Sequence, residues 1–257
     1  MHELEPAGAL AFISDLHLSG NHPDLTRLFL EFCRNLSGDF TDLFILGDLF
    51  DFWVHPRQAA ESPGAEVLQA LCGLQERGTA VHIMPGNRDF ALDGTILEKY
   101  RLSPLPDPSV LVLADGQHVL LTHGDLLCTE DIRYQRFRRT IRNPLVRQLL
   151  GRLPFGVLLW LAGQLRRRSR HEVRQKGMAV TRATPAGIAC ALRGQAPFYS
   201  RHAPYTLLLH GHTHQPLLEE REETAGRRLV LGDWSAGGAW IAEYRPGQDW
   251  LLRHFPG

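Results

Sequence analysis

Cysteine is scarce in this sequence of 257 residues, and the four that occur lie far apart. They are Cys33, Cys72, Cys128 and Cys190, and no two of them form a C-x-x-C pair. Neither a zinc knuckle nor a disulfide framework is therefore indicated. Dispersed cysteines without such a framework are typical of a reducing compartment.

Long hydrophobic runs are also missing. The longest apolar segment lies around residues 157–162, far short of the ~20 residues that a membrane-spanning helix needs. The first residues, M-H-E-L-E-P-A-G, lack the basic start and the long apolar core of a signal peptide. We therefore expect a cytoplasmic protein without a spanning helix.

Net charge is absent as well, because 28 basic residues balance 28 acidic ones. A neutral protein is not expected to bind nucleic acid through bulk charge. The balance conceals a local excess, since Arg133 to Arg182 includes thirteen arginines, one lysine and a single acid, Glu172. The length suits one domain with an insertion. We predict a single domain, 1–257, with a helical lid inserted at 131–193.

Strand and helix patterns alternate through the first hundred residues. Short apolar runs at 10–13, 43–46 and 80–84 predict buried strands, and apolar residues at helical spacing predict helices between them. This alternation is typical of βαβ units with a largely parallel central sheet. Later strands are predicted at 110–114, 118–121, 205–209, 217–221, 228–231, 240–244 and 250–254.

Polar and metal-binding side chains follow five of these strands. The segments are D-L-H, G-D, G-N-R-D, T-H-G-D and H-G-H-T-H, in that order along the chain. In open α/β sheets, sites form beyond the carboxyl ends of strands, so we expect the five segments to converge. Each segment alone has an ordinary explanation, because Gly-Asp is common turn chemistry and a lone histidine is more often a hydrogen-bonded core residue. Five together favour a functional site.

The side chains of these segments supply oxygen and imidazole ligands and no thiolate. Such a set suits Mn, Fe or Zn better than Ca or Mg alone. The number of acids favours two ions that share one carboxylate. Two-metal sites hold their ions ~3.5–4 Å apart and clamp the attacking and leaving oxygens of an in-line phosphoryl displacement. The sequence therefore predicts a di-metal site for phosphoryl chemistry.

The ordered motifs D-x-H, G-D, G-N-R-D, H-G-D and G-H-T-H resemble those of the calcineurin-like metallophosphoesterase superfamily. Longer segments, among them I-L-G-D-L-F-D-F-W, G-N-R-D-F-A-L and T-H-G-D-L-L-C-T-E-D, are similar to those of the UDP-2,3-diacylglucosamine hydrolases. The resemblance extends from Phe12 to Phe255. It implies an α/β fold, a four-layer αββα sandwich with a helical lid insertion.

The resemblance also implies an activity in lipid A biosynthesis. A water activated by two metal ions is expected to split the pyrophosphate of UDP-2,3-diacylglucosamine, giving UMP and 2,3-diacylglucosamine 1-phosphate (lipid X). Two Mn²⁺ ions per chain are implied, with Asp48 as the shared ligand. One ion is expected to bind Asp15, His17, Asp48 and His214, and the other Asp48, Asn87, His123 and His212.

Catalytic and substrate-binding residues follow from the same resemblance. Asn87, Arg88 and His123 are the implied catalytic residues, and Arg88 is expected to face the pyrophosphate because a guanidinium fork suits phosphate oxygens. Tyr134 falls near the same site, and Val173 stands where a polar contact is expected. The implied substrate-binding residues are Asn87, Arg88, Asp131, Ser169, Lys176 and His212.

Apolar residues are dense in the predicted lid. Ten of them between Leu145 and Leu161 are too many for one face of a short helix. Packing between lid helices accounts for some, and we expect the rest to form an acyl-chain pocket. Arginines follow at 166–168 and 170, and basic residues beside an apolar helix are typical of a membrane-surface element. We expect a monomer attached peripherally to the cytoplasmic face of the inner membrane.

Three other functions remain open from the sequence. A phosphodiesterase acting on nucleic acid could use the arginines to follow a phosphate backbone, although stacking aromatics are not interleaved with them. A hydrolase of soluble dinucleotides would not need the apolar lid. A scaffold that has lost its metals is disfavoured by the complete ligand set.

Overall fold

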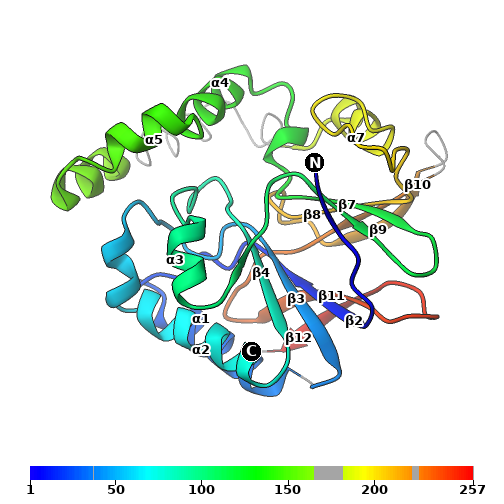
Figure 1. Ribbon diagram of the computed structural model, residues 1–257, viewed down its shortest axis with the longest axis horizontal. Coiled ribbons are helices and arrows are strands. Elements are labelled where there is room, and N and C mark those ends of the chain that lie inside the picture. The colour runs from blue at the N-terminus through cyan, green and yellow to red at the C-terminus, as the bar shows by residue number, and fades with distance from the viewer. Residues whose placement is uncertain (37, 165–181, 222–225, 257) are drawn as a thin grey trace.

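Two six-stranded sheets stacked face to face form the centre of the protein (Figure 1). The structure is a computed structural model that describes residues 1–36, 38–164, 182–221 and 226–256. Helices cover the outer face of each sheet, so the layers follow the order helix, sheet, sheet, helix (Figure 1). The four-layer αββα fold is confirmed.

The first sheet has the strand order β12-β11-β2-β3-β4-β5. Its parallel strands are β2 (Ala9–Ile13), β3 (Phe40–Leu46), β4 (Ala80–Met84) and β5 (Ser103–Pro104). The antiparallel strands β11 (Gly238–Tyr244) and β12 (Leu251–Pro256) complete one edge. Every residue of β2 is buried, because both faces of this sheet are covered. That double burial is why its strands are continuous apolar runs in the sequence.

The second sheet has the strand order β1-β6-β7-β8-β10-β9. Neighbours β7 and β8 run parallel, although the whole helical stretch separates them in the sequence. The alternation of strands and helices predicted a largely parallel central sheet, and the strands divide between two mixed sheets that bury a common core, as the family resemblance implied. The strands of the second sheet are β1 (His2–Leu4), β6 (Ser109–Val112), β7 (His118–Thr122), β8 (Leu207–His210), β9 (Leu217–Arg221) and β10 (Gly226–Val230).

Three apolar clusters hold the layers together. Between the sheets, Phe12 and Phe44 stack with ring centroids 5.0 Å apart and meet Leu121 and Leu209 of the other sheet. On the outer side of the first sheet lie α1 (Pro23–Asn35), α2 (Gly64–Glu76) and α3 (Gly94–Lys99). On the outer side of the second sheet lies α7 (Pro185–Leu192). A short 3₁₀ helix, η1 (Pro56–Ala60), precedes α2, and another, η2 (Asp125–Leu127), follows β7.

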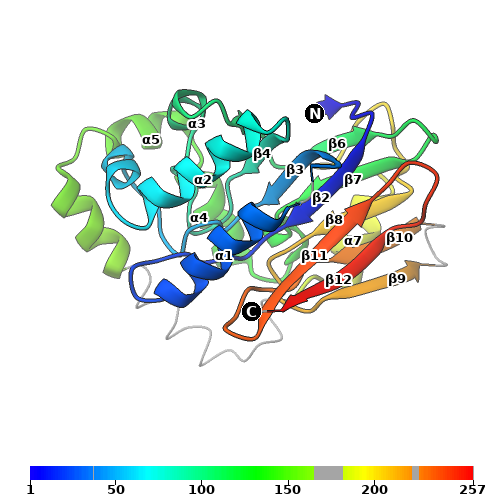
Figure 2. The same cartoon turned by 90° about the horizontal axis from the view of Figure 1, so that it is seen from below.

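A helical arm leaves the sandwich after β7. It consists of α4 (Ile132–Ile141), α5 (Pro144–Leu150) and a further helix, Phe155–Gln164. Figures 1 and 2 both place α4 and α5 on the side of the molecule away from β9 and β10. No residue of α4 or α5 is fully buried. Within the predicted lid, 131–193, these helices project outward whereas α7 packs on the second sheet.

The helices of the described chain differ in length and apolarity, which decide whether a helix can cross a bilayer. None of these helices is by itself long and apolar enough to cross a bilayer. Pro144–Leu150 and Phe155–Gln164 reach the required length and apolarity only as a pair, with a bend of 120° between them.

Candidate metal centre

The five predicted loops converge at one end of the sandwich, as expected. Beyond β2 and β3 the chain continues to pair, because Asp15 N–H donates to the Gly47 carbonyl (3.1 Å) and His17 N–H to that of Asp48 (3.0 Å). The loops of the second sheet join them, since His212 N–H donates to Asp15 Oδ2 over 2.8 Å. Both sheets therefore contribute to one site, and main-chain hydrogen bonds fix how its loops lie.

Backbone strain is concentrated in these loops. Six non-glycine residues of the described chain have a positive φ, and five of them are predicted metal ligands. Left-handed conformations are unfavourable for residues with a Cβ and persist where the surrounding structure enforces them, often at functional sites. The five are Asp15 (φ 56°), His17 (52°), Asp48 (53°), His212 (68°) and His214 (55°).

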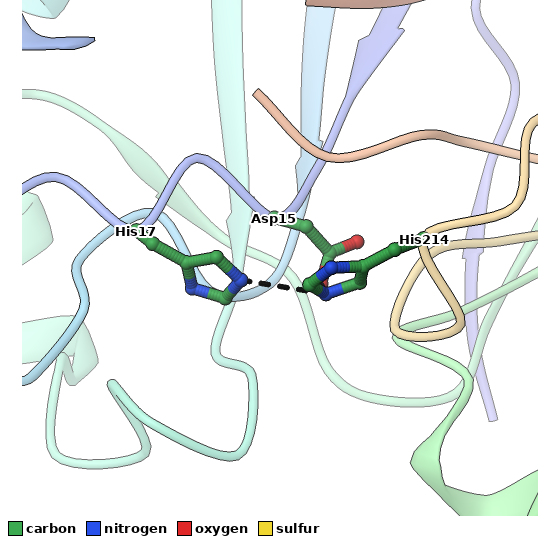
Figure 3. A group of neighbouring side chains, drawn as sticks. All are labelled: Asp15, His17 and His214. Atoms are coloured by element: carbon green, nitrogen blue, oxygen red, sulfur yellow. Dashed lines mark hydrogen bonds and ion pairs between the residues drawn. The ribbon is translucent and has the colours of Figure 1, made fainter. Parts of the chain in front are cut away.

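Asp15, His17 and His214 form the first ligand group (Figure 3). Their candidate ligand atoms all lie within 4.8 Å of one another. The Nε2 atoms of the two histidines are 3.4 Å apart, and His214 Nε2 is also 3.4 Å from Asp15 Oδ1. Two imidazole nitrogens and a carboxylate oxygen thus point toward one spot, which is the arrangement that a divalent cation requires.

Asp15, Asp48 and His123 form the second group by the same measure. His123 Nδ1 is 2.9 Å from the Leu46 carbonyl. A carbonyl only accepts, so Nδ1 bears a proton, and once the ring is neutral Nε2 turns its lone pair toward the site. His123 Nε2 lies 3.8 Å from Asp48 Oδ1, and His17 Nδ1 lies 3.8 Å from Asp48 Oδ2. Asp48 therefore stands between the histidines of the two groups.

Asn87 and His212 lie beside the second group. The His212 ring is 5.0 Å from the His123 ring, in an edge-to-face arrangement. Asn87 follows β4 and precedes Arg88, whose main-chain N–H donates to Asp48 Oδ1 over 2.9 Å. The structure thus brings all seven predicted ligands to one end of the sandwich. His212 belongs to neither of the groups whose ligand atoms lie within 4.8 Å of one another.

The polar atoms of this centre fit metal ions. Four of them are buried and make no hydrogen bond of good geometry within the described part of the chain: Asp15 Oδ1, His17 Nδ1, Asn87 Oδ1 and His123 Nε2. A buried polar atom without a partner is costly. Cations coordinated at this point would satisfy all four, and the oxygen and imidazole donors suit Mn, Fe or Zn.

Comparison with known proteins agrees with this geometry. The sequence matches the calcineurin-like phosphoesterase family over residues 9–216. The chain belongs to this family. It is 39% identical over 246 residues to a UDP-2,3-diacylglucosamine hydrolase of Azotobacter vinelandii, covering 95% of this chain and 97% of that protein. It is 40% identical over 238 residues to the hydrolase of the same name from Pseudomonas paraeruginosa, covering 91% and 94%.

Electrostatics divide the histidines of this phosphoesterase into two kinds. Burial lowers the pKa of His17 to about 3, with the Arg88 charge adding to the effect, and burial lowers the pKa of His212 to about 4. For His123, burial is outweighed by the charges of Asp48 and Asp15, and the pKa rises to about 9. For His214, burial is outweighed by hydrogen bonds to Asp15 and Asp233, and the pKa rises to about 10. A metal that binds His123 or His214 must therefore displace a proton from that ring.

Asp48 is the carboxylate most affected by its surroundings. Burial raises its pKa to about 7, His123 opposes the rise, and the nearby charges of Asp89 and Asp15 add to it. Asp15 shows the opposite direction, because hydrogen bonding to His214 and the histidine charges outweigh burial and lower its pKa. An acid whose charge is disfavoured in this way gains most from a bound cation.

Two supporting residues were assigned no role from the sequence, although Asp89 ends the G-N-R-D segment. Asp89 accepts N–H groups from Gly86 (2.7 Å) and Phe50 (3.3 Å) and ties two site loops together. Asp233 Oδ2 lies 3.4 Å from His214 Nδ1 and orients that ring. Asp233 follows β10, so the strand-end rule applied to one further strand would have found it.

His210, the first histidine of H-G-H-T-H, is structural. Its Nδ1 is 2.7 Å from the Gly211 carbonyl, and its Nε2 accepts from Arg228 Nε over 3.1 Å. Both ring nitrogens are therefore used. Burial and the Arg228 charge lower the pKa of His210 to about 3, so the ring is neutral.

The predicted substrate contacts are placed in part. Arg88 follows β4 at the rim of the site with its side chain 39% exposed. Asp131 caps the N-terminus of α4 and accepts the N–H of Tyr134 over 3.2 Å. The Tyr134 hydroxyl donates to Asp125 Oδ2, and its ring centroid is 6.4 Å from that of His212. Ser169, Lys176 and Val173 lie outside the described residues.

Proposed function

We propose that this phosphoesterase hydrolyses the pyrophosphate bond of UDP-2,3-diacylglucosamine, releasing UMP and 2,3-diacylglucosamine 1-phosphate in lipid A biosynthesis. The observation that carries the proposal is identity of 39% along almost the whole of a UDP-2,3-diacylglucosamine hydrolase. Two groups of buried and partly buried oxygen and imidazole donors at the convergent strand ends support it.

Two Mn²⁺ ions are the proposed cofactors, and Asp48 is proposed to bridge them. Asp15, His17 and His214 would hold one ion with Asp48, whereas Asn87, His123 and His212 would hold the other. Asp15 belongs to both compact groups. It also accepts a hydrogen bond from the His212 N–H, which would hold the loops of the two sheets together at the centre. When bound, the ions supply Lewis acidity and lower the pKa of water at the site.

The residues around the centre have separate proposed tasks. Arg88, half-exposed at the rim, binds the pyrophosphate oxygens and stabilises the charge that develops on them. Leu46 holds His123 in the tautomer that leaves Nε2 free for the site. Substrate contacts are proposed for Asn87, Arg88, Asp131, Ser169, Lys176 and His212.

The helical arm is proposed to be a lid for the acyl chains, inserted at 131–193 into a single domain. Its exposed apolar side chains support this task, since Leu145 is 69%, Leu149 61% and Trp160 60% exposed. Contiguous exposed apolar groups mark interaction sites, and arginines nearby favour an anionic leaflet. We propose that the protein is a monomer attached peripherally to the cytoplasmic face of the inner membrane.

One assay tests the proposed function. Purified protein is incubated with Mn²⁺ and UDP-2,3-diacylglucosamine, and UMP is measured with time. The matched controls are a chelator and the Asp48→Ala variant. Parallel reactions contain a dinucleoside polyphosphate and single-stranded DNA. Release of UMP from the lipid substrate alone supports the proposal. Hydrolysis of a nucleic acid or dinucleotide without UMP from the lipid overturns it.

A further inference from the structure

Asp51 is a buried acid that belongs to neither ligand group. It lies three residues beyond Asp48 in G-D-L-F-D-F-W, is only 7% exposed, and its Oδ1 accepts from Arg88 Nη1 over 2.7 Å. A hydrogen bond of this length between two charged groups is among the stronger contacts in a protein. It joins the loop after β3 to the loop after β4.

Main-chain contacts fix both partners of this ion pair. Asp51 N–H donates to the Leu18 carbonyl over 3.1 Å, and Trp53 N–H donates to the Arg88 carbonyl over 3.2 Å. Asp89 receives the N–H of Phe50, the residue before Asp51. The carboxylate therefore lies on a rigid loop, and it can impose its position on the longer and more flexible arginine side chain.

Two carboxylates contact two different nitrogens of the Arg88 guanidinium. Its Nη1 meets Asp51, and its Nε lies 3.5 Å from Asp48 Oδ2. Within the described residues Nη2 donates no hydrogen bond to the protein, and the side chain is 39% exposed. The Nη2 donors are thus available to phosphate oxygens of a substrate.

We propose that Asp51 is a positioning residue, which holds the Arg88 guanidinium toward the pyrophosphate without ligating a metal. This rests on the proposed function, because it presumes that Arg88 binds phosphate. Misplacement by about 1 Å can lower a rate by about 100-fold. A neutral amide of the same shape cannot replace the charge-assisted bond.

A double-mutant cycle tests the proposal. Asp51→Asn, Arg88→Ala and the double variant are compared with wild type for kcat, KM and metal content. We expect Asp51→Asn to lower kcat by roughly 10- to 100-fold with the metal retained. In the Arg88→Ala background the same change should cost less than about twofold, because coupled residues are not additive. Equal losses in both backgrounds, or loss of metal, would overturn the proposal.

Two further variants sharpen the cycle. Asp51→Glu retains the charge and should recover more activity than Asp51→Asn; no recovery contradicts the positioning role. Asp42→Asn, at the other end of β3, removes an acid that pairs with His82 over 2.9 Å and should leave kcat unchanged. If Asp51→Asn fails to fold in a thermal melt, Asp51→Ala takes its place in the cycle with the same expected coupling to Arg88.

The choice of substrate separates this proposal from the proposed function. All four proteins are also assayed with bis(p-nitrophenyl) phosphate, a small diester that needs only the metal centre and phosphate contacts. If wild type cleaves the diester and releases no UMP from the lipid, the proposed function fails. The coupling between Asp51 and Arg88 can then still be measured with the diester. Absence of coupling on a substrate that wild type cleaves refutes the role of Asp51 alone.

Discussion

The sheet-end site and the helical arm are built by different means. In the site, Asp15, Asp48 and His123 are buried and lie in loops joined by main-chain hydrogen bonds. In the arm, α4 and α5 bury no residue fully, and large apolar side chains such as Trp160 face outward. Rigid elements can keep ligands in strained conformations, whereas an exposed apolar arm can adapt to a flexible ligand.

The arm is attached to the sandwich chiefly by charge. Arg138 of α4 donates to both Asp107 and Asp125. Arg142 lies 3.4 Å from Asp107 and donates to the carbonyls of Pro85 and Gly86. Asp107 Oδ1 in turn accepts the N–H of His123 over 3.2 Å. The same buried acid therefore supports a proposed metal ligand and the base of the arm, which links the two regions.

The largest effect should come from removing the shared ligand. Asp48→Ala is expected to reduce activity to background and to cost metal at both positions, because it leaves each set of ligands incomplete. Elemental analysis of the purified variant measures the metal. Two metals per chain after this change would refute the bridging role. A circular-dichroism melt controls for folding.

Arg88→Ala should separate charge stabilisation from metal binding. Loss of one donor that stabilises a developing oxyanion typically costs about 10²–10³ in kcat. The metal content should be that of wild type, since no ligand is removed. A rate near that of wild type would mean that Arg88 serves only to hold the loop after β4.

Arg138→Ala should loosen the arm without dismantling the site. Removing one partner of a buried ion pair lowers the free energy of unfolding by about 3–5 kcal/mol. We expect a loss near the lower value, because Arg142 still pairs with Asp107. Thermal unfolding measures the loss of stability, and amide hydrogen exchange should show faster exchange in α4 and α5 than in β7. Uniform exchange throughout the chain would argue against a separately attached arm. Arg136→Ala, on the same helix, is the matched control.

Trp160→Ser and Leu149→Ser should distinguish lipid binding from metal chemistry. Each buried methylene contributes ~0.8 kcal/mol, so each variant should lower kcat/KM for the diacyl substrate by about tenfold or more. Hydrolysis of bis(p-nitrophenyl) phosphate should barely change. Leu158 is 5% exposed, so Leu158→Ser tests packing of the arm instead. Equal loss with both substrates in a folded Trp160 variant would contradict an acyl pocket.

The smallest predicted effect is a release of protons. With pKa values of about 9 and 10, His123 and His214 are protonated at pH 7, and each must become neutral to bind a metal. Binding of Mn²⁺ at pH 7 should therefore release at least two protons per chain, and release should decline as the pH rises toward 10. Calorimetric titrations in buffers of different ionisation enthalpy measure the number. No release at pH 7 would contradict the raised pKa values of these two histidines in the metal-free protein.

The sequence by itself determined the location of the site. Strands covered on both faces are continuous apolar runs, so the ends of β2, β3, β4, β7 and β8 could be identified, and the polar segments beyond them converge in the structure. Local chemistry also indicated phosphoryl transfer. The hydrophobic pattern did not reveal β1, β5 or α3, which are short and contribute few apolar residues.

Only the tertiary structure decided how these segments support one another. Periodicity reports whether a residue is buried, not which distant residue it meets, so the alternation pattern did not show the division into two mixed sheets, which only the family resemblance implied. Asp51 and Asp107 look like ordinary loop acids in the sequence, because their importance lies in contacts with Arg88 and Arg138, 37 and 31 residues away. The positive φ angles of the ligand loops likewise arise from hydrogen bonds between loops, which no local pattern encodes.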